Sequence, residues 1–139
     1  MKFLLDSNVL SDIGNERPWG GRLLSKIGQY AAHRCFLSAV SYTEMLSGLR
    51  SHAGRLTKQK SADLALIYET LEVLPYHREA ARAAAFLQAG TKGKLLPKID
   101  CMVAGHAIAD GFMMVTADDK DFSRMPGLTW VNWRKAKPA

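Results

Sequence analysis

Short apolar segments alternate with longer amphipathic ones along this chain of 139 residues. Each short segment is an apolar run ended by polar or turn-forming residues, a pattern typical of buried strands. Strands are expected at residues 3–5, 35–37, 73–74, 112–115 and 130–131. Strands that alternate with helices predict βαβ units, and therefore an α/β fold whose parallel sheet is covered on both faces.

Between these strands, apolar residues recur at helical spacing. Helices are expected to begin at Val9 and Ser41, to lie over residues 23–31 and 64–71, and to span residues 78–89 and 100–109. The last of them should stop at Gly111, because glycine commonly ends a helix. Two polar stretches are expected between helices: residues 48–60 as a loop or exposed helix start, and residues 90–97 as a loop.

Composition adds that the chain is an ordinary globular protein, with 47% hydrophobic and 23% charged residues. Its length suffices for one buried core. No repeat, low-complexity tract or linker interrupts it, so residues 1–139 are expected to form a single domain. Residues 134–139 are expected to form a frayed basic tail.

The formal net charge of +6 indicates a basic surface. Such a surface fits a nucleic-acid partner, and an unspecialised soluble surface explains it equally well. Cys35 and Cys101 lie far apart in apolar segments without zinc-type spacing, so reduced core thiols are expected. The N-terminus reaches an acid too soon for a signal peptide, and no apolar run has membrane-spanning length, so a cytoplasmic location is expected.

Four acidic residues follow short apolar stretches, each beside a hydroxyl or amide residue: Asp6, Glu44, Asp100 and Asp118. In an α/β fold such positions converge at one edge of the sheet, where ligands usually bind. Carboxylates gathered there repel one another unless a cation lies among them, and oxygen-rich clusters suit Mg²⁺ or Mn²⁺. The pattern favours a metal-dependent enzyme that acts on a phosphate backbone.

Each of these acids also has a local explanation. Asp6 suits a turn or helix cap, and Asp118 can cap a short turn at residues 119–122. Ser41 and Glu44 match a capping box, which taken alone is the favoured interpretation of Glu44. Asp100 suits the first turn of its helix. A capping acid can still face a shared cleft, and four such placements in one small domain favour the cleft.

Zinc sites, serine-hydrolase sites and phosphate-binding loops are less well supported by the sequence. The four histidines show no zinc-like pairing with each other or with a nearby acid, and His106 is expected to pack or to face solvent. Neither a GxSxG motif nor a glycine-rich phosphate loop occurs. Ser7, Asn8 and Thr116 are candidates for orienting ligands or water, although Thr116 is also ordinary strand filling.

The chain resembles the PIN-domain ribonucleases, and among them the VapC-type toxins of toxin–antitoxin pairs. The strings that carry the resemblance are LLDSNVLSD, LSAVSYTEMLSGL, IDCMVAGHAIADG and VTADDKDFSRMPGLTWVNW. It covers nearly the whole length, and the last string is the most specific. Ser7 stands where relatives often have Thr, and Asp118 where they frequently have Asn.

The resemblance implies a Rossmann-like, three-layer fold with about five parallel strands. It implies an acidic pocket that holds one or two Mg²⁺ or Mn²⁺ ions, a homodimer, and inhibition by a small antitoxin whose C-terminal segment enters the pocket. The implied pocket residues are Asp6, Glu44, Asp100 and Asp118. Whether Asp118 or Asp121 is the fourth ligand stays open, and Asp121 also fits a base or an ordinary helix residue.

The hypothesis is an endoribonuclease that hydrolyses RNA by metal-activated water. Asp6 and Asp100 would hold the main ion, while Glu44 and Asp118 would complete the site or bind a second ion. Candidates for RNA contacts, against an alternative of ordinary solvated charge, are Arg50, Arg55, Lys58, Lys60, Lys92, Lys94 and Lys98. Two rival functions are an aspartyl-phosphate phosphatase, which would need an acid where Asn8 stands, and a non-catalytic nucleic-acid-binding module.

Overall fold

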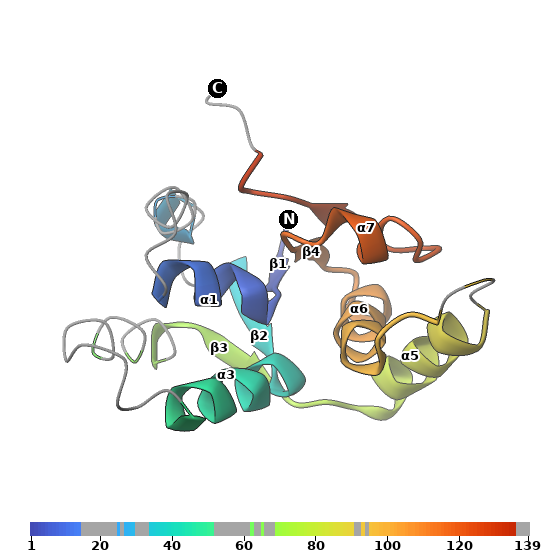
Figure 1. The fold of residues 1–139 in the computed structure, drawn as a ribbon, viewed down its shortest axis with the longest axis horizontal. Coiled ribbons are helices and arrows are strands. Elements are labelled where there is room, and N and C mark those ends of the chain that lie inside the picture. The colour runs from blue at the N-terminus through green and yellow to red at the C-terminus, as the bar shows by residue number, and fades with distance from the viewer. Residues whose placement is uncertain are drawn as a thin grey trace.

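The computed structural model describes residues 1–14, 25, 27–29, 34–51, 62, 65, 69–90, 93 and 95–135, with the backbone alone at residues 12–14 and 49–51. Its centre is a five-stranded sheet in the order β3-β2-β1-β4-β5, and every neighbouring pair is parallel (Figure 1). The strands are β1 (Phe3–Leu5), β2 (Cys35–Ser38), β3 (Glu72–Leu74), β4 (Met113–Val115) and β5 (Trp130–Val131).

Helices cover both faces of this sheet. They are α1 (Ser7–Gly14), α3 (Ala39–Ser51), α5 (Arg78–Gly90), α6 (Lys98–Asp110) and the short α7 (Asp119–Phe122). The expected α/β fold with a parallel sheet and a helical layer on each face is therefore confirmed. None of the described helices combines the length and the apolar character needed to cross a membrane.

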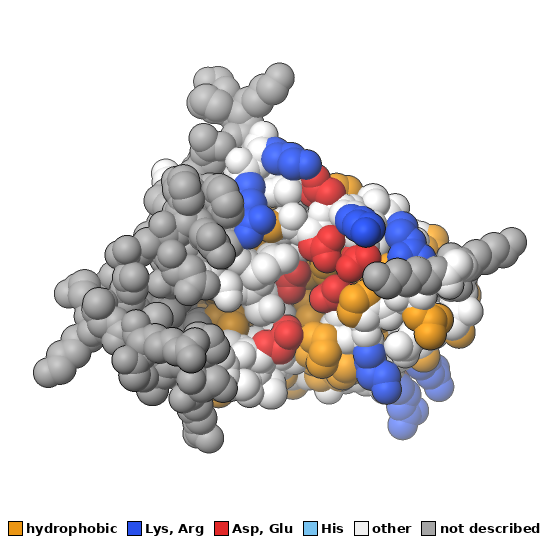
Figure 2. Space-filling model, in the orientation of Figure 1, with side chains coloured by type: hydrophobic (Ala, Val, Ile, Leu, Met, Phe, Trp, Pro, Cys, Tyr) orange, Lys and Arg blue, Asp and Glu red, His pale blue; other side chains and the backbone are white. Residues whose placement is uncertain are grey.

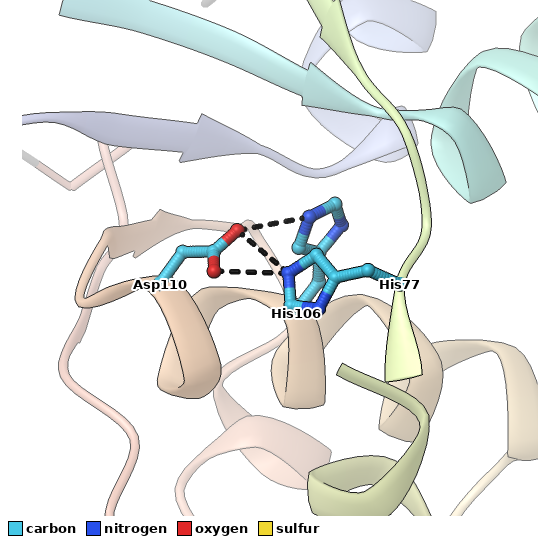
Figure 3. Close-up of side chains that lie close together, drawn as sticks. All are labelled: His77, His106 and Asp110. Carbon is cyan, nitrogen blue, oxygen red and sulfur yellow. Dashed lines mark hydrogen bonds and ion pairs between the residues drawn. The ribbon is translucent and has the colours of Figure 1, made fainter. Parts of the chain in front are cut away.

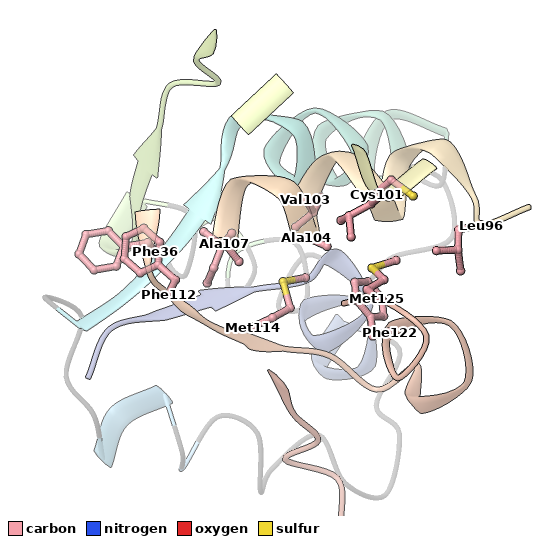
Figure 4. Close-up of a cluster of buried hydrophobic side chains, with 12 residues drawn as sticks. Phe36, Leu96, Cys101, Val103, Ala104, Ala107, Phe112, Met114, Phe122 and Met125 are labelled. Carbon is pink, nitrogen blue, oxygen red and sulfur yellow. The ribbon is translucent and has the colours of Figure 1, made fainter. Parts of the chain in front are cut away.

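Side chains that alternate along the strands divide the core into two clusters. Leu4 of β1 points to the face covered by α5 and α6, where it joins a cluster that includes Phe36, Met114 and Phe122 (Figure 4). The flanking Phe3 and Leu5 belong to the cluster on the opposite face, with residues of α1 and α3. Strands buried on both faces must be apolar at every position, which explains the short uninterrupted apolar runs in the sequence.

The packing of α5 against α6 depends on one glycine. A Cβ atom at Gly105 would lie 2.5 Å from the backbone nitrogen of Ala84 and 2.8 Å from the carbonyl oxygen of Ala80. The two helices can approach this closely only because Gly105 has no side chain. Helix α6 then ends at Gly111, whose φ of 71° is the left-handed conformation predicted for a glycine stop.

The expected strand bounds agree with the structure to within one residue. Helix α3 differs: it begins at Ala39 rather than Ser41, because the Ser38 hydroxyl accepts the N–H of Val40 at 3.2 Å and so satisfies the first turn. It also continues to Ser51, so residues 48–51 are helical rather than loop. Most of the helices expected over residues 23–31 and 64–71 lies outside the described residues.

The strand order predicts a ligand-binding crevice between β1 and β4. The chain moves from β1 outward to β2 and β3 on one side, then returns to β4 and β5 on the other. Strands β1 and β4 are therefore neighbours at which the direction of winding reverses. In open α/β sheets the carboxyl ends of such strands form the usual binding crevice.

Candidate active site

Asp6 lies at the carboxyl end of β1, in the crevice beside β4. Its backbone N–H donates to the carbonyl oxygen of Val115 at 2.8 Å, which fixes the residue against the end of β4. One carboxylate oxygen accepts the N–H of Ser7 at 2.8 Å, and the other accepts the hydroxyl of Thr116 at 3.0 Å. The side chain is only 4% exposed, so both oxygens are held in a fixed direction.

The surroundings of Asp6 favour its protonated form. The pKa of Asp6 is raised to about 7: burial is the largest cause, the carboxylates of Asp100 and Glu44 also raise it, and the hydrogen bonds from Thr116 and Ser7 lower it. Its carboxylate form is thus poorly compensated by the protein itself. A cation in the crevice would supply the missing compensation.

Thr116 and Asn8 connect α1 to the loop after β4. The Thr116 hydroxyl accepts the N–H of Asp118 at 3.1 Å and is 3.4 Å from the side-chain nitrogen of Asn8. The side-chain oxygen of Asn8 accepts the N–H of Ala117 at 3.3 Å. Thr116 is fully buried, and its hydroxyl bonds to three groups around the crevice. Thr116 therefore does more than fill the strand.

Three further carboxylates gather around the start of α6. Oxygens of Asp100, Asp118 and Asp121 all lie within 4.8 Å of one another. The pKa of Asp100 is raised to about 6, mainly by burial and also by the nearby carboxylates of Asp118, Asp121 and Glu44. Asp118 also caps α7 as expected, because its side chain accepts the N–H of Asp121 at 3.1 Å. Asp118 thus both caps α7 and belongs to the acidic group.

Glu44 reaches the same crevice from α3. Its carboxylate accepts the hydroxyl of Ser7 at 3.1 Å and contributes to the raised pKa values of Asp6 and Asp100. The capping-box interpretation is wrong, because α3 begins two residues before Ser41. Glu44 is therefore a helix-interior acid that faces other acids.

The donor set fits a hard divalent cation. It consists of carboxylate oxygens, which Mg²⁺ and Mn²⁺ prefer, and the neighbouring carboxylates raise the pKa values of Asp6 and Asp100. Both Asp118 and Asp121 belong to the compact group with Asp100, so proximity alone does not choose between them. Figure 2 shows acidic side chains in the middle of this face, with Lys and Arg side chains around them.

Only one of the basic residues proposed for RNA contacts can be placed with its side chain. Lys98, the first residue of α6, is exposed two positions before Asp100. The Arg50 side chain and all of Arg55, Lys58, Lys60, Lys92 and Lys94 lie outside the described residues.

An open, largely apolar groove adjoins the acidic crevice between α3 and α6. Its volume is about 470 Å³, and it is lined by Val40, Thr43, Glu44, Ser47, Ile99 and Met102. Glu44 thus lies between the groove and the acids. No sequence pattern predicted the groove, because its lining comes from two helices far apart in the chain.

The expectation that no histidine pairs with a nearby acid is wrong, whereas His106 packs in the interior, which is one of the two settings expected for it. His106 is fully buried, and its Nε2 lies 3.2 Å from a carboxylate oxygen of Asp110, one helical turn further along α6. His77, from the segment before α5, bonds to the same carboxylate at 2.9 Å. The i,i+4 spacing of His106 and Asp110 was the available signal, while His77 joins them only through the fold.

Comparison with known proteins agrees with this geometry. Residues 3–128 match the PIN domain family. The chain is 32% identical to VapC ribonuclease Y4jK of Sinorhizobium fredii, over 96% of this chain and 99% of that protein. It is 25% identical to the tRNA(fMet)-specific endonuclease VapC of Shigella flexneri, over 96% of this chain and 98% of that protein.

A solved structure is similar over the same extent. DNA-bound VapBC from Salmonella typhimurium contains a chain of the same fold, with a TM-score of 0.79 and 26% sequence identity, covering 96% of this chain and 98% of that one. The sheet order, the acidic crevice and the match over residues 3–128 lead to one assignment. This chain belongs to the PIN domain family.

Proposed function

We propose that this protein is a metal-dependent endoribonuclease and the toxin component of a type II toxin–antitoxin pair. The observation that carries the proposal is the convergence of acids from four parts of a PIN domain on one crevice. They are Asp6 after β1, Glu44 on α3, Asp100 on α6, and Asp118 with Asp121 around α7. The ribonuclease names of the relatives support RNA as the substrate.

Asp6 and Asp100 are proposed to hold the main ion, Mg²⁺ or Mn²⁺. Glu44 and one of Asp118 and Asp121 complete that site or hold a second ion. When bound, the ion would lower the pKa of a water molecule and offset the charge that builds up on the phosphate. Thr116 and Ser7 hold the Asp6 carboxylate in one direction, so the crevice needs little rearrangement when the ion enters.

The partners follow from the same family. The Salmonella relative is named as a VapBC assembly, which supports a second protein bound to this chain. We place a small antitoxin over the acidic crevice, where it would exclude RNA, and a homodimer as the working state. Since RNA is the substrate and both cysteines are free and buried, the enzyme is assigned to the cytoplasm.

The test is cleavage of total RNA and transfer RNA by purified protein in Mg²⁺ or Mn²⁺. Asp100→Asn should lose at least about a hundredfold in rate, because it removes a carboxylate from the metal site. Asp119→Asn is the matched control, since Asp119 lies in the same region but bonds to Asn132 and Lys135 outside the acidic group. EDTA should abolish cleavage by both the wild type and the control.

The other outcomes separate the rival functions. Equal cleavage by wild type and Asp100→Asn would overturn the site assignment. RNA binding without turnover in either metal would favour a binding module. A stable phosphoenzyme would favour the phosphatase, although Asn8 already uses its side-chain oxygen to bond the N–H of Ala117.

A further inference from the structure

A second polar cluster lies on α6 away from the acidic crevice. It comprises His77, His106 and Asp110 (Figure 3). The hydroxyl of Ser38 contacts the other ring nitrogen of His106. His106 follows Asp100 by six residues, which is about 9 Å along a helix axis. The proposed nuclease function makes no use of this cluster.

Both imidazole rings point their Nε2 atom toward the carboxylate of Asp110. Nε2 of His77 is 2.9 Å and 3.1 Å from the two oxygens of Asp110, and Nε2 of His106 is 3.2 Å from one of them. Ligand atoms of all three residues lie within 4.8 Å of one another. Around a tetrahedral zinc ion with bonds of about 2.0–2.1 Å, neighbouring ligand atoms are roughly 3.3 Å apart. The cluster is therefore close to the spacing that such an ion requires.

His106 has the setting of a metal-ligating histidine. The ring is fully buried, and its Nδ1 lies 2.9 Å from the hydroxyl of Ser38. That hydroxyl already accepts the N–H of Val40, and its second lone pair can accept a hydrogen bond from the Nδ1–H of His106. Nε2 would then present a lone pair toward Asp110. Metal-bound histidines usually donate their other ring N–H in this way.

Nε2 of His106 is also one of the buried polar atoms that lack a hydrogen-bond partner among the described residues, despite its nearness to Asp110. A buried nitrogen without a well-aligned partner costs free energy. An ion between this nitrogen and the carboxylate would satisfy both atoms. This orphaned nitrogen is an observation independent of the spacing of the three residues.

The cluster is open on one side. The side chains of His77 and Asp110 are 38% and 32% exposed, so an ion can enter and keep water as a remaining ligand. Nδ1 of His77 accepts the N–H of Ala80 at 3.3 Å at the start of α5. Coordination through Nε2 would place the ring proton on Nδ1 and break this long contact, so the bound ion should exchange readily.

We propose that His77, His106 and Asp110 form a binding site for a borderline transition-metal ion, with Zn²⁺ the best fit. Two imidazoles and a carboxylate suit Zn²⁺ or Co²⁺, whereas the all-oxygen crevice suits Mg²⁺ or Mn²⁺. The bound ion would tie the segment before α5 to the last turn of α6. The two sites thus offer different donor atoms: nitrogen and oxygen here, and oxygen alone in the acidic crevice.

The test measures Zn²⁺ by calorimetry, Co²⁺ by visible absorption, and thermal unfolding with and without Zn²⁺. His77→Asn removes one ligand yet keeps a residue that caps helices well, so the variant should fold. Asp110→Asn removes the shared carboxylate, and Asp100→Asn is the control in the acidic crevice. We expect His77→Asn and Asp110→Asn each to weaken Zn²⁺ binding at least roughly tenfold. Both should also lose the Zn²⁺-dependent rise in melting temperature.

The Asp100→Asn control should retain the Zn²⁺ binding that His77→Asn loses and give the same Co²⁺ spectrum as the wild type. Two results would overturn the proposal: wild-type affinity in His77→Asn, or loss of the ion in Asp100→Asn alone. Neither result depends on RNA cleavage, so this site and the nuclease function are tested separately.

Discussion

At the scale of single residues, the acidic crevice combines fixed geometry with unfavourable charge. Asp6 is 4% exposed and bonded through both oxygens, yet its pKa is raised to about 7. Hydrogen bonds orient the carboxylate but do not compensate its burial. A site of this kind is destabilising when empty and suited to a cation, because the cation supplies the compensation.

Without metal, the protein should become less stable as the pH rises. Between pH 3.8 and about 7 the folded state holds a proton on Asp6 that the unfolded state has released, so the free energy of unfolding falls across this window. The full difference is on the order of 4 kcal/mol as an upper bound. Urea unfolding in EDTA at about pH 5 and about pH 8 spans about two units of this window and should show roughly 3 kcal/mol of it. Asp6→Asn should remove most of the difference, and an unchanged difference would contradict the assignment.

The hydroxyl of Thr116 should contribute more to metal binding than its methyl group does. Thr116→Val keeps the shape but removes the bond to Asp6 and the acceptor for the N–H of Asp118. Because the bond from Thr116 lowers the pKa of Asp6, its loss should raise that pKa and weaken metal binding roughly tenfold to a hundredfold. Calorimetry with Mn²⁺ is the measurement. Thr116→Ser retains the hydroxyl and should bind as the wild type does; equal losses in both variants would mean a packing role.

At the scale of elements, α6 links the sites to the core. Asp100 lies in its first turn, His106 and Asp110 lie further along, and Gly105 allows its close contact with α5. The position of the acids therefore depends on how closely these two helices pack.

Two glycine substitutions should have opposite effects on stability. Gly105→Ala would place a methyl group 2.5 Å from the backbone of Ala84, so the helices must separate, at a cost of about 1–3 kcal/mol or more. Gly48→Ala on α3 meets no atom within 4 Å and should stabilise the protein by up to about 1 kcal/mol through helix propensity. Denaturant unfolding compares them. A neutral Gly105→Ala would mean that α5 and α6 tolerate a wider separation.

The sequence predicted the strands well because both faces of the sheet are covered, which leaves uninterrupted apolar runs such as Phe3–Leu5. It pointed to Asp6 and Asp118 because they come soon after β1 and β4, whereas Asp100 follows a loop and Glu44 lies within α3. That these acids bind metal stays a prediction.

The sequence patterns failed at two contacts. The cap of α3 is a local one, in which Ser38 accepts the N–H of Val40, but the capping-box spacing of Ser41 and Glu44 favoured a later start. His77 joins His106 and Asp110 only after β3 and α6 come together, and no local pattern predicts that contact.

At the scale of the whole molecule, an acidic crevice lies on a chain with a net charge of +6. The acids hold metal in this proposal, so phosphates must be attracted by basic residues elsewhere. Lys98 is exposed at the start of α6, next to the crevice. Figure 2 shows Lys and Arg side chains around the acidic centre of this face. Such an arrangement directs an RNA backbone across the acids without requiring contact with bases.

RNA binding by the inactive Asp100→Asn variant should therefore weaken steeply with salt. With four phosphate contacts to a single strand, affinity would fall about fiftyfold between roughly 50 and 200 mM salt. Lys98→Gln should lower the slope of log affinity against log salt by about 0.7, the contribution of one contact. Lys120→Gln removes the charge of an exposed lysine on α7. It tests whether the salt dependence of RNA binding follows the position of the lysine or only the total charge. A slope near zero would remove the basic surface from the mechanism, and equal changes in both lysine variants would assign the effect to net charge alone.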